Sequence, residues 1–177
     1  MQNDFIIALA WPEGMVTCTN AWYDKFFSTN GKYRVGHSAV VLVERVSGKL
    51  YYFDFGRYHS PKKFGRVRDV ETDHDVAIKT LAEIKDNKIV NLKVILQEIK
   101  NNVAFHGEGT LYASILNDVS FKKAYRYAKH TQERGFILYG PFVYNGTNCS
   151  RFVASVMRSS SPTFIKNARL KLPFCIS

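Results

Sequence analysis

A hairpin over residues 35–56 is the feature of this sequence that most restricts its fold. The apolar, β-branched run VGHSAVVLV (residues 35–43) is followed by a Ser47-Gly48 turn and the aromatic run KLYYFDFG (residues 49–56). Two such runs around a Gly-containing turn are typical of paired antiparallel strands. The sequence therefore predicts a hairpin, and its first strand reads as a central strand of a sheet.

Two polar residues in this hairpin call for an explanation. If the turn centres on Ser47-Gly48, His37 lies across from residues 56–58, and Asp54 is its diagonal neighbour to within two or three residues of register. Asp54 is surrounded by aromatic residues, where an unpaired carboxylate is costly to bury. A hydrogen bond or ion pair with His37 would explain why a carboxylate lies at this position. The plainer alternatives are that His37 is an ordinary hydrogen-bonded histidine and that Asp54 pairs with Arg57 or another basic residue.

Cys149 lies where a Gly/Asn-rich turn, residues 144–147, leads into an amphipathic helix predicted over residues 150–158. Backbone N–H groups and the positive end of the helix dipole gather at such an N-terminus. Both stabilise a thiolate, the nucleophilic form of cysteine, and the N–H groups can also stabilise an oxyanion. This is the layout of a papain-type nucleophile. Alternatively, Cys149 is a small apolar residue that closes a turn.

These motifs resemble those of a known branch of cysteine hydrolases. The runs GHSAVVL (residues 36–42) and NCSRFV (residues 148–153), in this order, resemble the circularly permuted NlpC-type, papain-like hydrolases, which include the lecithin:retinol acyltransferase-like proteins and bacterial relatives. The stretches 37–58 and 144–157 are similar to an uncharacterised bacterial family of that branch. The match covers about a fifth of the chain. Neither block alone identifies the family, and the resemblance rests on the presence of both blocks in this order.

The resemblance implies a Cys–His–Asp triad, with Cys149 as nucleophile, His37 as general base and Asp54 as the orienting group. It also implies an antiparallel sheet with the Cys149 helix packed against it. Acyltransferase relatives usually carry a second histidine on the following strand, where this chain has Asp54; His59, beyond the strand, is the alternative third member. The family includes peptidases, amidases, acyltransferases and inactive proteins, so the expected substrate is a peptide, a peptidoglycan fragment or an acyl compound.

The rest of the chain fits one α+β domain over residues 1–177. Helices are predicted over residues 21–27, over 88–102 with Asn87 as cap, and over 121–134 with Ser120 as cap. Residues 5–10, 76–78 and 136–139 are expected to be extended, and 111–115 a strand or a helical turn. A basic loop (57–68) is expected to fold against the acidic run 69–75, and the segment from 160 onward ends as a basic tail.

Charge and composition narrow the function classes. The chain has 25 Lys and Arg residues against 15 Asp and Glu residues, a net charge of +10 that favours anionic partners. The basic residues are dispersed and no nucleic-acid-binding motif is present, so nucleic acid is not the expected partner. The competing function is a catalytically inactive binding protein that holds an anionic ligand in the same cleft. Trp11, Trp22, Tyr58 and Tyr144 are candidate pocket residues, although core packing is the commoner role of such aromatics.

No cofactor or metal site is expected. The three cysteines (Cys18, Cys149 and Cys175) and five histidines have no zinc-ligand spacing, and Cys18 and Cys175 lack the turn into a helix that marks Cys149. No apolar run reaches the roughly 20 residues of a membrane helix, and the N-terminus does not read as a secretory signal. The sequence therefore predicts a cytoplasmic protein, or a chain whose export signal has been lost or is unconventional. Its oligomeric state is not indicated.

Overall fold

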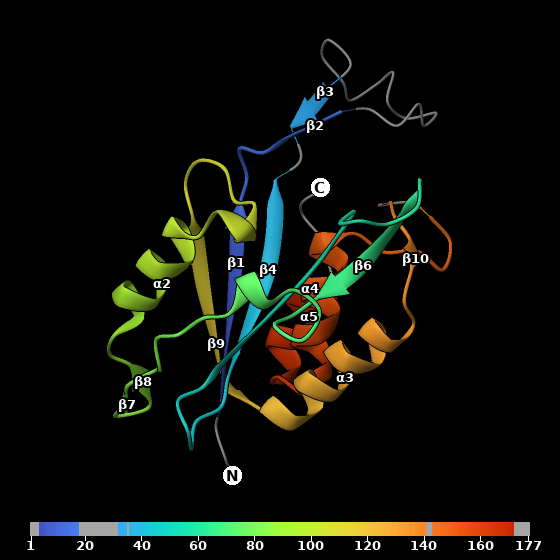
Figure 1. The fold of residues 1–177 in the computed structure, drawn as a ribbon. Coiled ribbons are helices and arrows are strands. Elements are labelled where there is room, and N and C mark those ends of the chain that lie inside the picture. The colour runs from blue at the N-terminus through green and yellow to red at the C-terminus, as the bar shows by residue number, and fades with distance from the viewer. Residues whose placement is uncertain (1–3, 18–31, 35, 141–142, 172–177) are drawn as a thin grey trace.

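The computed structural model describes residues 4–17, 32–34, 36–140 and 143–171. Its centre is a six-stranded sheet in the order β10-β6-β5-β4-β1-β9, in which all neighbouring strands are antiparallel (Figure 1). The strands are β1 (Asp4–Trp11), β4 (His37–Val43), β5 (Leu50–Gly56), β6 (Phe64–Arg68), β9 (Tyr112–Val119) and β10 (Ile137–Leu138). The predicted α+β class and antiparallel sheet are confirmed.

Four α-helices and several short elements complete the described structure. The helices are α2 (Leu92–Asn101), α3 (Phe121–Glu133), α4 (Cys149–Ser159) and α5 (Phe164–Lys171). Two 3-10 turns are η1 (His74–Val76) and η2 (Val103–Phe105). Two small hairpins pair β2 (Met15–Thr17) with β3 (Lys32–Arg34) and β7 (Ile84–Lys85) with β8 (Lys88–Ile89).

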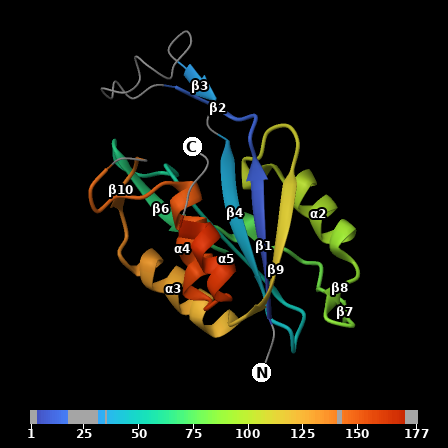
Figure 2. The ribbon, with the colours of Figure 1, turned by 180° about the vertical axis from the view of Figure 1, so that it is seen from behind.

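The sheet separates two hydrophobic cores, because successive side chains of a strand point to opposite faces. On one face, Ile7 and Val41 pack with residues of α2 and η2 such as Ile95. On the other, Ile6 and Val40 pack with residues of α3 and α4. Figures 1 and 2 show this arrangement from opposite sides, with α2 over one face and α3 and α4 over the other. The central strands are therefore covered on both sides, which explains their near-continuous apolar sequences.

Side-chain caps define the starts of the two helices on the second face. The Ser120 hydroxyl accepts a hydrogen bond from the Lys123 N–H, and the side-chain Oδ1 of Asn148 accepts one from the Arg151 N–H at 2.8 Å. Such caps satisfy N–H groups that lack partners within the helix. The helix predicted over 121–134 is confirmed at 121–133. The helix predicted from residue 150 is also confirmed, and it begins with Cys149 itself.

Four predictions were wrong in part. The helix predicted over 88–102 starts only at Leu92, because residues 84–89 form a hairpin whose turn, Asp86-Asn87, has positive φ angles. Asn87 is therefore a turn residue and not a cap. Residues 74–76 form η1, where a strand was expected from 76.

The other two errors concern basic segments. The predicted basic loop 57–68 contains β6, and the predicted basic tail contains α5. The helix predicted over 21–27 lies outside the described residues. Within the described part of the chain, none of the helices has both the length and the apolar character that crossing a membrane requires.

Candidate active site

The candidate site lies at one end of the sheet, where β4 begins and β5 ends. Ala39 pairs with Asp54 across the two strands, so the same register places His37 opposite Gly56, within the predicted range. The His37 and Asp54 side chains point to the same face, and His37 Nε2 lies 3.0 Å from Asp54 Oδ2. The predicted diagonal contact between these residues is therefore present.

Asp54 is fully buried and has four side-chain partners. Besides His37, the Tyr52 and Tyr58 hydroxyls donate to Oδ2 at 2.8 and 3.0 Å. Arg68 donates from Nε to Oδ1 at 3.1 Å and from Nη2 to Oδ2 at 2.7 Å. Burial alone would raise the pKa of Asp54, but its hydrogen bonds to His37 and Arg68 and their charges hold that pKa well below its usual range.

The predicted alternative, that Asp54 pairs with a basic residue, is therefore also present, and the residue is Arg68 and not Arg57. It went unnoticed in the sequence because residues 57–68 read as a loop. The signal that could have found it is the alternation in FGRVR (residues 64–68), which places Val67 in the core and makes β6 a strand beside β5. In that pairing Arg68 lies directly across from Asp54.

Tyr58 connects the triad candidates to Arg68 and to His106. Its hydroxyl oxygen lies 3.2 Å from His37 Nε2 as well as 3.0 Å from Asp54 Oδ2. The Arg68 guanidinium lies 3.5 Å from the centre of the Tyr58 ring, and the His106 ring stacks on Tyr58 with a centroid separation of 5.3 Å. The sequence identified Tyr58 only as a candidate pocket residue; its hydrogen bonds to the triad candidates were not predicted.

The His37 ring is also supported from its own face of the sheet. Trp11, its partner on β1, stacks against it with ring centroids 5.8 Å apart and an interplanar angle of 20°. Gly36 leaves no room for a side chain, since a Cβ there would lie 2.3 Å from the Trp11 carbonyl oxygen. Trp11 is buried, so this candidate pocket residue acts as a support for His37.

Cys149 reaches this end of the sheet from the other layer. It is 3% exposed, and its Sγ lies 3.9 Å from the Gly36 carbonyl oxygen. Burial raises the pKa of the Cys149 thiol. The hydrogen bond and charge of His37 and the hydrogen bonds from Ser38 outweigh burial and lower that pKa to about 7. Ser38, next to His37 in β4, is a further site residue that the sequence did not indicate.

The pKa of His37 shifts in the opposite direction, upward. Burial lowers it, but hydrogen bonds to Asp54 and Cys149 and the charges of both groups outweigh burial and raise it to about 9. A cysteine with a pKa near 7 beside a histidine with a pKa near 9 forms an ion pair in the range between them. The arrangement favours thiolate and imidazolium at neutral pH.

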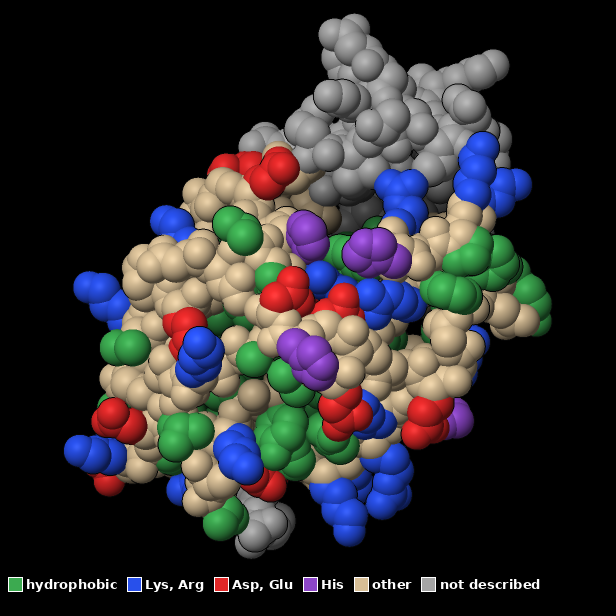
Figure 3. Space-filling model, viewed as in Figure 1, with side chains coloured by type: hydrophobic (Ala, Val, Ile, Leu, Met, Phe, Trp, Pro, Cys, Tyr) green, Lys and Arg blue, Asp and Glu red, His purple; other side chains and the backbone are tan. Residues whose placement is uncertain are grey.

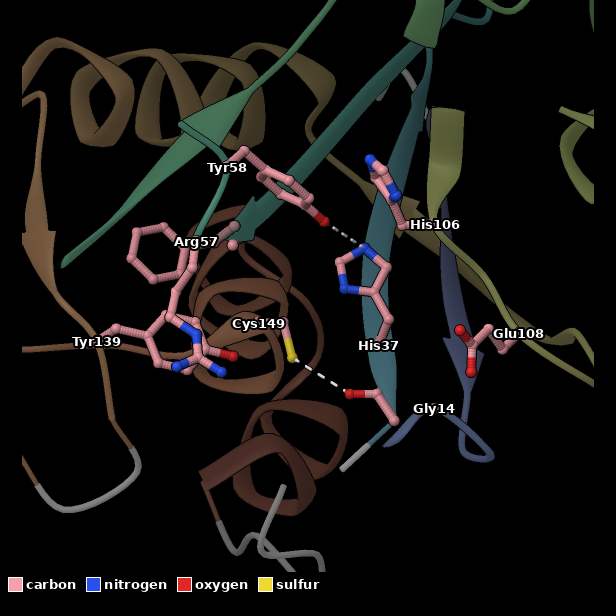
Figure 4. Close-up of a pocket in the computed structure, with 11 residues that line it drawn as sticks. Gly14, His37, Arg57, Tyr58, His106, Glu108, Tyr139 and Cys149 are labelled. Atoms are coloured by element: carbon pink, nitrogen blue, oxygen red, sulfur yellow. Dashed lines mark hydrogen bonds between the residues drawn. The ribbon is translucent and has the colours of Figure 1, made fainter. Parts of the chain in front are cut away.

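The cleft around these groups has two side walls (Figure 4). On one side lie Arg57 and Tyr139, with the guanidinium carbon 5.3 Å from the centre of the Tyr139 ring. On the other lie His106 and Glu108, from the segment that joins η2 to β9. Cys149 and His37 lie between these walls, where a bound molecule would meet both of them.

Other candidates lie away from the cleft or outside the described residues. His59 is exposed and is not among the residues that line the cleft, so it does not orient His37. Tyr144 is 88% exposed. Trp22, Cys18 and Cys175 lie outside the described residues. Within the described ranges, no group of three or more His, Cys, Asp or Glu residues is placed to hold a metal ion.

Charged side chains are mixed on the face shown in Figure 3. Lys and Arg residues alternate there with Asp and Glu residues, without a continuous basic stripe. One pairing joins the segments predicted to fold together, because Arg66 donates to both carboxylate oxygens of Asp73 at 2.7 Å. Part of the basic segment is thus neutralised within the fold.

Comparison with known proteins places this fold in a family. A crystal structure of the type VI secretion system effector TseH matches with a TM-score of 0.62 and 20% sequence identity, over 96% of this chain and 86% of that chain. At this identity the match shows a shared fold. A search of curated proteins found no match. A family model described as type VI secretion system effector TseH-like matches residues 6–164, and the chain therefore belongs to the TseH-like family of type VI secretion effectors.

Proposed function

We propose that this protein is a cysteine hydrolase that cleaves an amide or ester bond. The observation that carries the proposal is that His37, held by Asp54 at 3.0 Å, lines the same cleft as Cys149, which lies at the N-terminus of α4 with its Sγ 3.9 Å from the carbonyl oxygen of Gly36, the residue before His37. A nucleophile beside a base that a third group orients is the usual arrangement for covalent catalysis. The order of His37, Asp54 and Cys149 along the chain also supports the resemblance to permuted NlpC-type hydrolases.

In the proposed reaction the Cys149 thiolate attacks the carbonyl carbon of the substrate. The backbone N–H of Cys149 and the α4 dipole stabilise the oxyanion that forms. The His37 imidazolium then donates its proton to the leaving nitrogen or oxygen, and a thioester remains on Cys149. Neutral His37 next takes a proton from water, the resulting hydroxide attacks the thioester, and the acid product leaves with Cys149 restored as the thiolate.

The proposed substrate class rests on the carbonyl group that the reaction requires and on the resemblance to permuted NlpC-type hydrolases. A peptide, a peptidoglycan fragment or an acyl ester offers the carbonyl that Cys149 requires, and no metal or cofactor takes part in the proposed steps. Membership of an effector family supports the second expectation for localisation, export by a route other than an N-terminal secretory signal. We propose that the bond cleaved belongs to a target outside the producing cell.

The test is the pH dependence of Cys149 alkylation by iodoacetamide, followed by peptide mapping so that Cys18 and Cys175 are counted separately. We expect the rate at Cys149 to rise with an apparent pKa near 7, and His37→Ala to move it toward the ordinary thiol value of about 8.5. His59→Ala is the matched control and should leave the profile unchanged. An ordinary thiol profile in the unaltered protein would refute the proposal and favour the inactive binding protein.

A screen for activity completes the test. The purified protein and its Cys149→Ala variant would be incubated with peptides, peptidoglycan fragments and acyl esters, and the products identified by mass spectrometry. Product release that requires Cys149 supports hydrolysis. Tight binding of a ligand without turnover, by both forms alike, would instead support the binding protein.

A further inference from the structure

The two walls of the cleft carry opposite charges that the described part of the fold does not neutralise. Arg57 and Glu108 are both exposed and both line the cleft. Among the described residues, neither has an ion pair or a side-chain hydrogen bond, whereas the buried Arg68 is paired with Asp54. Two unpaired charges of opposite sign facing a nucleophile are available to a ligand.

Arg57 is oriented before any ligand binds. Its guanidinium lies over the Tyr139 ring, and that ring stacks in turn on Phe55 with an interplanar angle of 8°. The Tyr139 N–H also donates to the Lys63 carbonyl oxygen at 2.9 Å, which fixes this wall. A planar guanidinium held over an aromatic ring keeps its donors for a carboxylate, and little side-chain entropy remains to be lost on binding.

Glu108 is positioned by a loop that has its own internal support. Gly109, which follows it, has a φ of +78°, and a Cβ there would collide with the Glu13 carboxylate. Glu13 accepts a hydrogen bond from the Thr110 N–H at 3.3 Å, so the Glu13 carboxylate stabilises the loop. Glu108 is left to face the cleft, on the side opposite Arg57 and Tyr139 in Figure 4.

We infer that the cleft selects substrates that carry a carboxylate on the Arg57 side and an ammonium group on the Glu108 side of the bond to be cleaved. The inference rests on the proposed function, since it needs Cys149 as the reacting centre. The two contacts would orient such a zwitterionic substrate across the nucleophile. A neutral substrate, or one with a single kind of charge, loses one or both contacts.

Charged alkylating reagents test the Arg57 side without knowledge of the substrate. Cys149 displaces iodide from either iodoacetate or iodoacetamide and forms a thioether. The ratio of the two rates at one pH reports recognition of the carboxylate, because the thiolate fraction cancels. Arg57→Gln should lower the iodoacetate to iodoacetamide ratio about 2- to 10-fold, the range of an exposed to partly desolvated charge pair. Arg57→Lys should recover part of it.

The matched control is Arg134→Gln, which removes the same charge from an exposed position at the end of α3. If the inference is right, the ratio for Arg134→Gln stays within about 1.5-fold of the unaltered protein, as expected for a screened distant charge. An equal change in both variants would mean that the ratio follows net charge alone, and would overturn the role of Arg57.

A second reagent pair tests the Glu108 side. The thiolate attacks the sulfenyl sulfur of a methanethiosulfonate, forms a mixed disulfide and releases methanesulfinate. Glu108→Gln should lower the rate of the cationic aminoethyl reagent relative to the neutral methyl reagent by about 2- to 10-fold. The control is Glu83→Gln, because Glu83 is exposed and is not among the residues that line the cleft. This variant should leave the ratio of the two rates unchanged.

These outcomes are separable from failure of the proposed function. If Cys149 reacts as an ordinary thiol and His37→Ala changes nothing, the nucleophile itself is absent. If Cys149 reacts with an apparent pKa near 7 but its charge preferences do not depend on Arg57 and Glu108, the hydrolase proposal stands and the zwitterion inference is overturned.

Discussion

Arg68 holds both carboxylate oxygens of Asp54, at 3.1 and 2.7 Å, in a region where both side chains are almost completely buried. The carboxylate of Asp54 is therefore paired with a cation on one side and with His37 on the other. Burial lowers the pKa of His37, and Asp54 raises it through both its hydrogen bond and its charge. The Arg68 Nη2 group also donates to the Ala104 carbonyl oxygen, which ties this pair to η2.

Removal of Arg68 should be strongly destabilising, because it leaves a buried carboxylate without its cation. We expect Arg68→Met to lower the free energy of unfolding by about 3–5 kcal/mol, measured by urea denaturation. Arg66→Met is the control, since it breaks the less buried ion pair with Asp73, and it should cost about 1 kcal/mol. Equal losses in the two variants would contradict this account of Asp54.

The neutral double variant should be more stable than either single variant. Asp54→Asn leaves Arg68 as an unpaired buried cation, whereas Asp54→Asn combined with Arg68→Met removes both charges and keeps an acceptor beside His37. We expect coupling of at least about 1 kcal/mol in a double-mutant cycle. Additive losses would show that the two side chains do not act as a pair.

The thiol and the imidazole should titrate in separate steps. Below pH about 7 Cys149 is protonated, between about 7 and about 9 thiolate and imidazolium coexist, and above about 9 His37 loses its proton. Thiolate absorbance near 240 nm, taken as the difference from Cys149→Ser, should rise near pH 7. NMR of the His37 ring should report deprotonation near pH 9. A histidine that titrates below the cysteine would contradict the ion pair.

The two helix caps offer a comparison between stability and reactivity. Asn148→Ala and Ser120→Ala should each lower the free energy of unfolding by about 1 kcal/mol, since each removes an N-cap. Only Asn148→Ala should also slow alkylation of Cys149 at pH 7, because only that cap fixes the helix start that carries the thiol. Equal alkylation rates in both variants would show that the cap has no part in the site.

Gly56 should be required for the position of Tyr58. A Cβ at residue 56 would lie 2.3 Å from the Tyr58 ring, so Gly56→Ala must displace that ring and its hydrogen bonds to Asp54 and His37. We expect the apparent pKa of Cys149 alkylation to shift in Gly56→Ala and, in the same direction, in Tyr58→Phe. Gly135→Ala controls for loss of a glycine away from the site: a Cβ there meets nothing within 4 Å but the φ of +67° strains it, so stability should fall while reactivity stays unchanged.

The parts of the fold that could be predicted from sequence are those that local patterns determine. The 35–56 hairpin and the helix from Ser120 were identified because strand composition, a Gly turn and a capping residue act within a few positions. The helix at Asn87 was misplaced because a positive-φ Asp-Asn turn and a cap look alike in sequence. The local pairing of β7 with β8 across this turn decided between them.

The candidate site shows the same division. His37, Asp54 and Cys149 could be selected from residue type and order along the chain, and the structure places His37 beside Asp54 and in the same cleft as Cys149. Arg68 could not be selected from the sequence, because the pairing of β5 with β6 is what places it beside Asp54. The packing of His106 on Tyr58 could not be predicted either, because it depends on a contact between segments that are distant in the sequence. Residues that support the site from another element leave little local signal in the sequence.

The separation of the reacting groups along the chain has a consequence for the timing of activity. Gly36, whose carbonyl group contacts Cys149, precedes it by 113 residues, and α4 joins the sheet from the second layer. During synthesis the hairpin that carries His37 and Asp54 emerges long before the thiol does. A nascent or truncated chain that lacks α4 therefore contains the base without the nucleophile. In the proposed enzyme, a chain that stops before α4 therefore cannot carry out covalent catalysis, even though its base and orienting carboxylate are already in place.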